Sequence, residues 1–258
     1  MLRKIIDLCV VLLAVAMMVS CNREAVESDD VKSQELANDL TKQGDVALKN
    51  KDYETAVNCY SKAEQLGQPY ARLHLGIMFL NGVGVEPDGA KAFNLLSHHD
   101  TIELPEAMYY LSIMYANGTG VEKDPQESVK WLRKAAEQGL AVAQNNLGNM
   151  YYSGEGVEKD LAEAAKWFRM AAELGNAMAQ YNLGLMYQNG DGVEKNSKES
   201  VKWLRKAAEQ GLAAAQYSLG VMFANGDGVE KDSKEAVKWL RKAAEQGHEN
   251  AKKHLDAL

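Results

Sequence analysis

Apolar residues recur at helical spacing along most of this chain, and the pattern restarts in each following stretch of similar length. Between residues 140 and 153 the apolar positions form one stripe of a helix: Ala143, Leu147, Met150 and Tyr151. Gly154 follows, and it can end the helix because glycine adopts left-handed backbone angles at no steric cost. A second helical stripe comes next: Ala164, Trp167, Phe168 and Ala171. The pattern therefore predicts a unit of two helices.

Short polar residues stand where each second helix is expected to begin. Asp160 precedes the second stripe, and Glu163 follows three residues later, which is an acidic variant of the capping box. The same combination recurs along the chain: Asp124 with Glu127, Asn196 with Glu199, and Asp232 with Glu235. These residues predict that the second helices are capped by side chains.

The unit is repeated almost verbatim. The sequence WLRKAAEQG occupies residues 131–139, 203–211 and 239–247, and such self-similarity indicates a solenoid of stacked units. Small residues flank each tryptophan, while Cys59 and Leu95 take its place in the first two units. Cysteine and leucine would be unusual replacements for a ligand-binding aromatic residue. We therefore expect all four tryptophans to be structural core residues: Trp131, Trp167, Trp203 and Trp239.

The pattern A-x-x-x-L-G-x-M-Y-x-x-G-x-G-V-x-x-D, followed by E-A-x-K-W-x-R-x-A-A-E-x-G, resembles the Sel-1-like repeat over residues 69–258. Residues 34–68 resemble a tetratricopeptide helix pair instead. The resemblance implies an all-α fold, a right-handed superhelical solenoid of antiparallel helix pairs. The second unit departs from the pattern at LLSHHDTIELPEAMYYLS and should be the least regular, whereas polar substitutions after residue 248 indicate a C-terminal capping helix.

The N-terminal end of the chain predicts a membrane attachment. Residues 1–20 have the charged start and apolar stretch of a signal peptide, and MMVSC resembles a bacterial lipobox with Cys21 as the lipidated residue. A plain cleavable signal is the alternative. By the same resemblance, Asn22 favours the outer membrane of the bacterial cell envelope, facing the periplasm or the surface. Residues 21–33 are acidic and polar, and we expect a flexible tether.

The composition excludes some functions and offers little chemistry. A formal net charge of −7 without a basic stripe argues against nucleic-acid binding. No catalytic constellation stands out, and we expect neither an enzyme nor a cofactor. His98 and His99 are adjacent, so on a helix they would point about 100° apart and would not share a metal. The loop NGDGVEKN is interpreted as a turn followed by a helix cap, not as a calcium loop.

Three positions of the first helices vary between copies and fall on one stripe at i, i+4 and i+7. In solenoids of the resembling kind the first helices line the concave wall, where tyrosine and carboxamide side chains suit peptide recognition. The candidate partner-binding residues are Tyr109, Asn145, Asn149, Tyr152, Tyr181, Gln188 and Tyr217. Drift of unconstrained positions is the alternative explanation.

These features predict a lipid-anchored helical scaffold or adaptor that binds protein or peptide partners at the bacterial cell envelope. A second hypothesis comes from the resemblance, since some secreted members of that family are said to engage cell-wall precursors or β-lactams. Those relatives are rich in paired cysteines, and this chain has three cysteines in all. A purely structural role in an envelope assembly is the third hypothesis.

Overall fold

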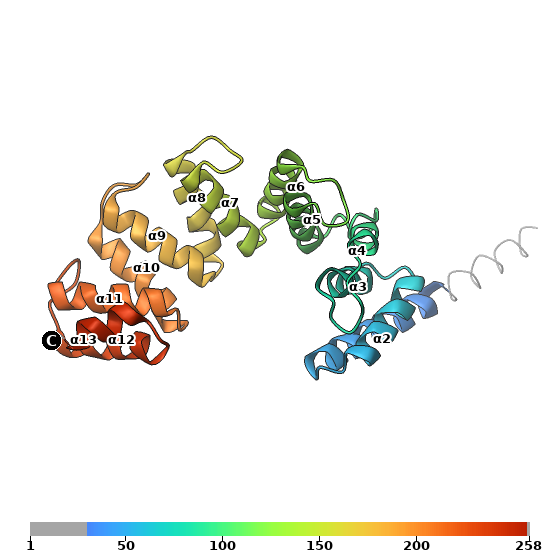
Figure 1. Ribbon diagram of the computed structural model, residues 1–258, viewed down its shortest axis with the longest axis horizontal. Helices are drawn as coiled ribbons and strands as arrows, with labels where there is room; N and C mark the ends of the chain where they lie inside the picture. Colours follow the sequence, from blue (N-terminus) through green and yellow to red (C-terminus); the bar gives the residue numbers. More distant parts are fainter. Residues whose placement is uncertain (1–29, 257–258) are drawn as a thin grey trace, which may run out of the picture. The chain divides into compact units, whose positions relative to one another are not determined.

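The computed structural model describes residues 30–256, and every regular element among them is an α-helix (Figure 1). The chain divides after Thr101 into two compact units, which are described separately. The first unit contains a helix at residues 30–49, α2 (Tyr53–Gln65), α3 (Pro69–Asn81) and α4 (Gly89–Leu96). The second unit contains α5 (Pro105–Asn117), α6 (Pro125–Glu137), α7 (Ala141–Ser153), α8 (Leu161–Glu173), α9 (Ala177–Asn189), α10 (Ser197–Glu209), α11 (Ala213–Asn225), α12 (Ser233–Glu245) and α13 (Glu249–Asp256).

Neighbouring helices pack in pairs, and the pairs pack in file within each unit. In the second unit α5 packs on α6, α7 on α8, α9 on α10 and α11 on α12, and each pair contacts the next. This arrangement confirms the predicted all-helical solenoid of helix pairs. The second repeat is irregular, as expected, because α4 has 8 residues whereas the matching helix α6 has 13.

The second helices begin at side-chain caps, as the sequence predicts. Asp160 Oδ1 accepts hydrogen bonds from the backbone N–H of Ala162 at 2.9 Å and of Glu163 at 3.0 Å. The reciprocal half of the capping box does not form. The Glu163 carboxylate instead lies 3.2 Å from Lys166 Nζ, and the Asp160 N–H donates to the carbonyl of Tyr151. An ordinary aspartate cap therefore starts α6, α8 and α12, and Asn196 caps α10 in the same way.

A glycine in each loop permits close packing on the preceding repeat. Gly192 has φ 65°, which is a left-handed conformation, and a Cβ added there would collide with the carbonyl of Leu161 at the start of α8. Glycine is therefore required here for two reasons, the backbone angle and the missing side chain.

Three of the four repeated tryptophans lie in seams between consecutive repeats. Trp167, Trp203 and Trp239 are each 5% exposed. Trp203 of α10 packs into a cluster that α8 of the preceding repeat and α9 of its own repeat supply: Ala164, Ala165, Phe168, Ala171, Ala172, Ala179, Leu183, Met186 and Tyr187. Trp131 is only half-buried.

Buried glutamines also join consecutive repeats. Gln180 of α9 donates to the carbonyl of Ala172 at 3.0 Å, which anchors α9 on α8. Gln210, which follows α10 in the same repeat, donates to Gln180 Oε1 at 2.8 Å and to the carbonyl of Gly175 in the preceding repeat at 3.0 Å. Gln216 and Gln246 repeat this arrangement. We call this arrangement the glutamine bridge.

The predicted signal peptide, Cys21 and most of the predicted tether lie outside the described residues. The tether prediction is wrong at 30–33, because the helix at residues 30–49 already includes them. Val31, Lys32 and Ser33 include neither proline nor glycine, so the polar segment has no residue that stops a helix. Among the described helices, none combines the length and the apolar character that a membrane crossing requires.

Candidate functional site

A row of hydrogen-bonded carboxamides crosses the first helices of three consecutive repeats. Asn146 of α7 donates to the hydroxyl of Tyr109 on α5 at 3.3 Å. Asn182 Nδ2 of α9 donates to the side-chain oxygens of Asn145 at 3.2 Å and Asn149 at 3.3 Å. We call these five residues the carboxamide row. The row ties one face of α5, α7 and α9 together by side chains.

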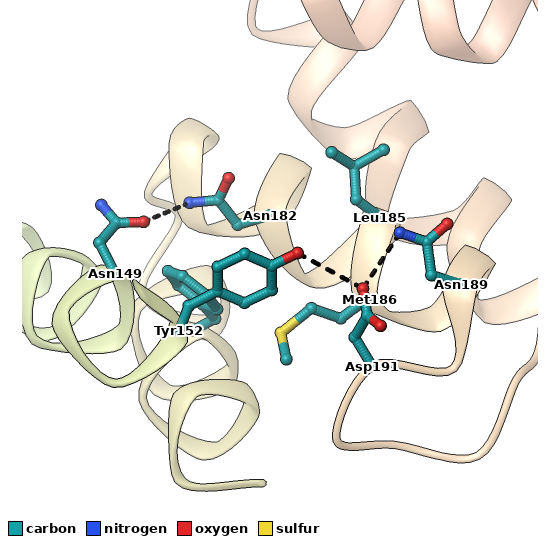
Figure 2. A pocket seen from close by; sticks show the side chains of 8 residues that line it. Asn149, Tyr152, Asn182, Leu185, Met186, Asn189 and Asp191 are labelled. Carbon is teal, nitrogen blue, oxygen red and sulfur yellow. Dashed lines mark hydrogen bonds between the residues drawn. The ribbon is translucent and has the colours of Figure 1, made fainter. Parts of the chain in front are cut away.

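A hollow opens beside this row, between α7 and α9 (Figure 2). Its volume is about 210 Å³, and we call it the α7–α9 hollow. Polar and apolar side chains line it together: Asn149, Tyr152, Phe168, Asn182, Leu185, Met186, Asn189 and Asp191. The lining has the composition that is typical of a binding pocket, which is apolar surface together with a few convergent polar groups.

The polar end of the hollow is organised around one carboxylate. Asp191 Oδ2 accepts a hydrogen bond from the Tyr152 hydroxyl at 3.5 Å and another from Asn189 Nδ2 at 3.1 Å. Figure 2 shows both side chains directed at this carboxylate. Tyr152 keeps 41% of its surface exposed, so the rim of the hollow remains open to a ligand.

The predicted stripe is only partly the stripe that the structure assembles. Asn149 and Tyr152 line the hollow, and Tyr109 and Asn145 belong to the carboxamide row. Gln188 is half-buried and is not part of the hollow's lining.

Two predicted tyrosines take part in packing instead. Tyr181 packs at the edge of the core cluster of α10, α11 and α12. Tyr217 stacks on His248 with ring centroids 4.6 Å apart and packs on the C-terminal cluster. Both tyrosines lie on a half-buried helix face, and their rings contact the next repeat.

The sequence pattern missed Asn182, Asn189 and Asp191. Asn182 follows Tyr181 directly, so it lies about 100° further around α9 and faces α7. Asp191 belongs to the glycine loop that the sequence explains as a turn. The signal that was available is the asparagine content of the first helices, with Asn145, Asn146, Asn149, Asn182 and Asn189 in two consecutive repeats.

The outer surface of the second helices carries paired charges. Lys130, Lys166, Lys202 and Lys238 each pair with a glutamate three residues earlier, at 2.7–3.2 Å. The partner Glu127 raises the pKa of Lys130, and Lys238 lowers the pKa of Glu235. These exposed charges already compensate one another. This surface is therefore a weaker candidate for ligand binding than the hollow.

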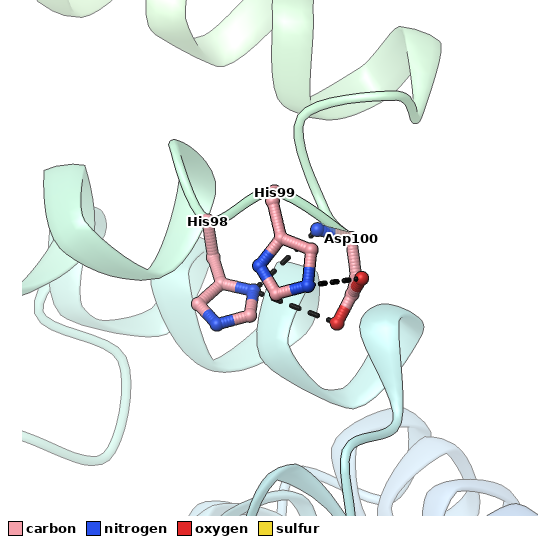
Figure 3. A group of neighbouring side chains, drawn as sticks. All are labelled: His98, His99 and Asp100. Atoms are coloured by element: carbon pink, nitrogen blue, oxygen red, sulfur yellow. Dashed lines mark hydrogen bonds and ion pairs between the residues drawn. The ribbon is translucent and has the colours of Figure 1, made fainter.

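His98, His99 and Asp100 form a cluster in the first unit (Figure 3). They lie in the turn after α4 and not on a helix, so the expectation that the two rings diverge is wrong: their centroids are 4.3 Å apart. One possible ligand atom from each residue lies within 4.8 Å of the others. His99 Nε2 is 2.8 Å from Asp100 Oδ1.

A buried arginine occupies the inner side of this cluster. Arg72, whose side chain is 7% exposed, lies 2.7 Å from His98 Nδ1 and 3.6 Å from Asp100 Oδ2. Because a guanidinium only donates, His98 Nδ1 accepts and carries no proton. The cation that compensates Asp100 is therefore Arg72, which Glu64 also contacts at 3.3 Å. The cluster is explained as an ion-pair network that fixes the irregular turn.

A second hollow lies in the first unit beside Asp45. It has a volume of about 360 Å³, and its lining includes Gln68, Tyr70 and His74. Asp45 accepts a hydrogen bond from the Tyr60 hydroxyl at 2.8 Å. Burial, followed by this hydrogen bond, raises the pKa of Tyr60 above its ordinary value. The buried phenol stays protonated and holds the carboxylate in place.

The sequence model of the Sel1 repeat family matches this chain at residues 39–68, 69–97, 105–140, 141–176, 177–212 and 213–248. The match extends to the first helix pair, for which the sequence suggested a tetratricopeptide-like unit. No match is found among curated proteins.

Solved structures of similar proteins have the same fold. A protective antigen present in uropathogenic Escherichia coli strains, with an SLR fold, is 35% identical with a TM-score of 0.78 over 89% of this chain and 50% of the antigen. This chain therefore spans about half the length of that antigen. A Sel1 repeat protein from Oxalobacter formigenes is 36% identical with a TM-score of 0.77, over 84% of this chain and 89% of that one. The immunity protein Pa5087 from Pseudomonas aeruginosa, 23% identical with a TM-score of 0.52 over 79% of this chain and 81% of its own, shares the fold alone.

Proposed function

Because this chain belongs to the Sel1 repeat family, we propose that it is a helical scaffold that binds a protein or peptide partner through the face of α5, α7 and α9. Sel1 repeats generally mediate protein–protein interactions and are generally non-catalytic scaffolds. The face is chosen because it carries both the carboxamide row and the α7–α9 hollow.

One observation carries this proposal. Asn182 uses its Nδ2 group and Asn149 uses its Oδ1 atom within the row. Asn149 Nδ2 and Asn182 Oδ1 have no partner among the hydrogen bonds of the described residues, so one donor and one acceptor remain, at the two outer ends of this hydrogen-bonded pair (Figure 2). A peptide group offers the complementary acceptor and donor. The pair is therefore suited to the backbone of an extended segment, whatever its side chains.

Site-specific photo-crosslinking in intact cells tests this function. A photo-reactive residue at Leu185, which lines the hollow, should capture a partner, whereas one at Lys166 on the exposed face of α8 should not. Adding Asn149→Ala and Asn182→Ala should weaken capture about tenfold to a hundredfold, since each lost hydrogen bond is worth about 0.5–1.5 kcal/mol.

The matched control replaces Glu163 and Lys166 by alanine, which also changes two polar residues and leaves the net charge unaltered. Equal capture at Leu185 and Lys166, or capture at Leu185 that survives the asparagine double variant, would count against this face. Binding of a fluorescent penicillin or of peptidoglycan fragments by the purified chain, without a captured protein, would favour the cell-wall hypothesis instead.

We also propose that the scaffold is held at the bacterial cell envelope by lipid on Cys21. The support is the sequence alone, the lipobox-like MMVSC after an apolar leader. Several acyl chains give an effectively permanent attachment, since each buried methylene contributes about 0.8 kcal/mol. Cys21→Ala should abolish labelling by radioactive palmitate and release the chain from the membrane pellet. Unchanged labelling of that variant would contradict the lipid anchor.

A further inference from the structure

We propose that the α7–α9 hollow receives a lysine or arginine side chain of an extended peptide, with Asp191 as its counter-ion. This inference rests on the proposed function, because the same asparagines hold the peptide backbone beside the hollow. It adds the chemical class of the ligand, a segment that places one cationic side chain next to the backbone groups bound by Asn149 and Asn182.

Asp191 is a half-buried carboxylate whose side-chain partners are both neutral. Tyr152 and Asn189 both donate to its Oδ2 atom, and no ion pair to Asp191 is found within residues 30–256. By contrast, the glutamate in the first turn of each of α6, α8, α10 and α12 has a lysine partner, as Glu163 has Lys166. Asp191 Oδ1 therefore remains available in a half-buried position, where a cation is attracted more strongly than at a fully solvated carboxylate.

The walls of the hollow suit the rest of such a side chain. Phe168, Leu185 and Met186 supply apolar surface, against which the methylene stem of lysine or arginine can pack while the charged head reaches Asp191. The Tyr152 ring stands beside the carboxylate (Figure 2), and Lys159 Nζ already lies 6.0 Å from its centroid. A small anion or a purely apolar side chain would leave the carboxylate uncompensated.

The neighbouring repeats lack this combination. The position of Tyr152 is held by Gln188 in the next repeat, although Asp227 stands there in the place of Asp191. Asp227 Oδ2 accepts from Asn225 at 3.3 Å, without a tyrosine. In the preceding repeat Glu155 occupies the loop position. The structure therefore predicts one basic residue per bound segment and not a periodic basic pattern.

Selection from a random dodecapeptide library on the purified full-length chain tests the inference. The enriched peptides should share one lysine or arginine. Replacing that residue by norleucine or citrulline should raise the Kd on the unaltered chain by about tenfold or more, as expected for loss of a charge-assisted hydrogen bond. With Asp191→Asn, which keeps an acceptor for Tyr152 and Asn189, charged and uncharged peptides should bind alike.

Two variants make the outcomes distinguishable. Asp227→Asn removes the same charge one repeat away and should retain the full preference for the basic residue. Asn149→Ala with Asn182→Ala should weaken all peptides equally. A far-UV spectrum and a melting curve like those of the unaltered chain establish that each variant is folded.

The inference is overturned if enriched peptides lack a basic residue, or if Asp191→Asn keeps the discrimination. In that case binding that still depends on Asn149 and Asn182 leaves the proposed function intact. If the library yields no binder at all, or if peptidoglycan glycan fragments compete equally with and without the Asp191 charge, the proposed function fails together with the inference.

Discussion

Leu174 interrupts the glutamine bridge, and replacing it by glutamine should stabilise the protein. Gln138, Gln210 and Gln246 occupy the corresponding positions of other repeats. Where leucine stands, its side chain is 59% exposed, and Gln144 Oε1, the atom that the missing glutamine would reach, is buried without a partner. One substitution therefore removes an exposed apolar side chain and an unpaired buried acceptor.

The local backbone already fits the change. Leu174 has φ −77° and ψ 2°, and Gln210, which forms the bridge, has φ −76° and ψ 0°. An unpaired buried acceptor costs about 1–3 kcal/mol, from which part of the roughly 1.5–2 kcal/mol of glutamine side-chain entropy must be subtracted. We expect Leu174→Gln to raise the free energy of unfolding by about 1 kcal/mol, or the Tm by about 2–4 °C for a chain of this size.

Chemical denaturation followed by circular dichroism measures this difference, and the reverse change supplies the control. Gln210→Leu should leave Gln180 Oε1 unpaired and lower the stability by about 1–3 kcal/mol. If Gln210→Leu has no effect, the bridge contributes nothing to stability. If Gln210→Leu is destabilised but Leu174→Gln does not raise the free energy of unfolding, the unpaired oxygen of Gln144 does not destabilise the protein.

Trp203→Ala should cost about 3–5 kcal/mol in a urea titration, and Trp131→Ala clearly less because Trp131 is half-buried; equal losses would contradict the seam packing. Gly184→Ala should lower the Tm despite alanine's higher helix propensity, because the new Cβ would lie 2.7 Å from Leu204 Cγ; a raised Tm would show that the helices can separate cheaply. Tyr60 has a raised pKa, so its contribution to stability is complete below about pH 10 and is lost as the pH rises further. The urea concentration at the unfolding midpoint should therefore decrease between about pH 9 and pH 11, and it should decrease less in the variant Tyr60→Phe.

The sequence predicts the fold well because the same local signals occur in every repeat. From α3 onward, the glycine after each first helix has a left-handed backbone, and its N–H donates to a methionine carbonyl, as Gly154 does to Met150. Asp160 caps the second helix through the expected backbone groups. Such signals act within a few residues, so they can be recognised without knowledge of the partner helices.

Side-chain partners from other repeats were harder to predict. Arg133 lies four residues before Glu137 on its own helix, but it donates to the Tyr151 hydroxyl of the next repeat at 2.6 Å. Glu163 turns to Lys166 and not to the helix start. The contact of Arg133 depends on which neighbour is nearer in the folded chain, and sequence spacing along one helix does not contain that distance.

The candidate site could be predicted in part for the same reason. Asn149 and Tyr152, which line the hollow, could be identified because they vary between copies. Such variation marks the face of a first helix that does not pack into a hydrophobic core. It did not identify Asn182, since the helix rotation relative to α7 decides whether position 181 or position 182 faces the preceding repeat. The histidine pair was misjudged because the helix α4 ends at Leu96, before it reaches His98.

A titration of side-chain amide signals in the NMR spectrum tests the central claim most directly, with the unaltered chain and a peptide recovered by selection. The account predicts that the Nδ2 signals of Asn149 and Asn182 shift with peptide concentration, whereas the Nε2 signals of Gln210 and Gln246 in the glutamine bridges stay in place. Shifts confined to the bridge glutamines or to the second helices, with both asparagine signals unmoved at saturation, would contradict it.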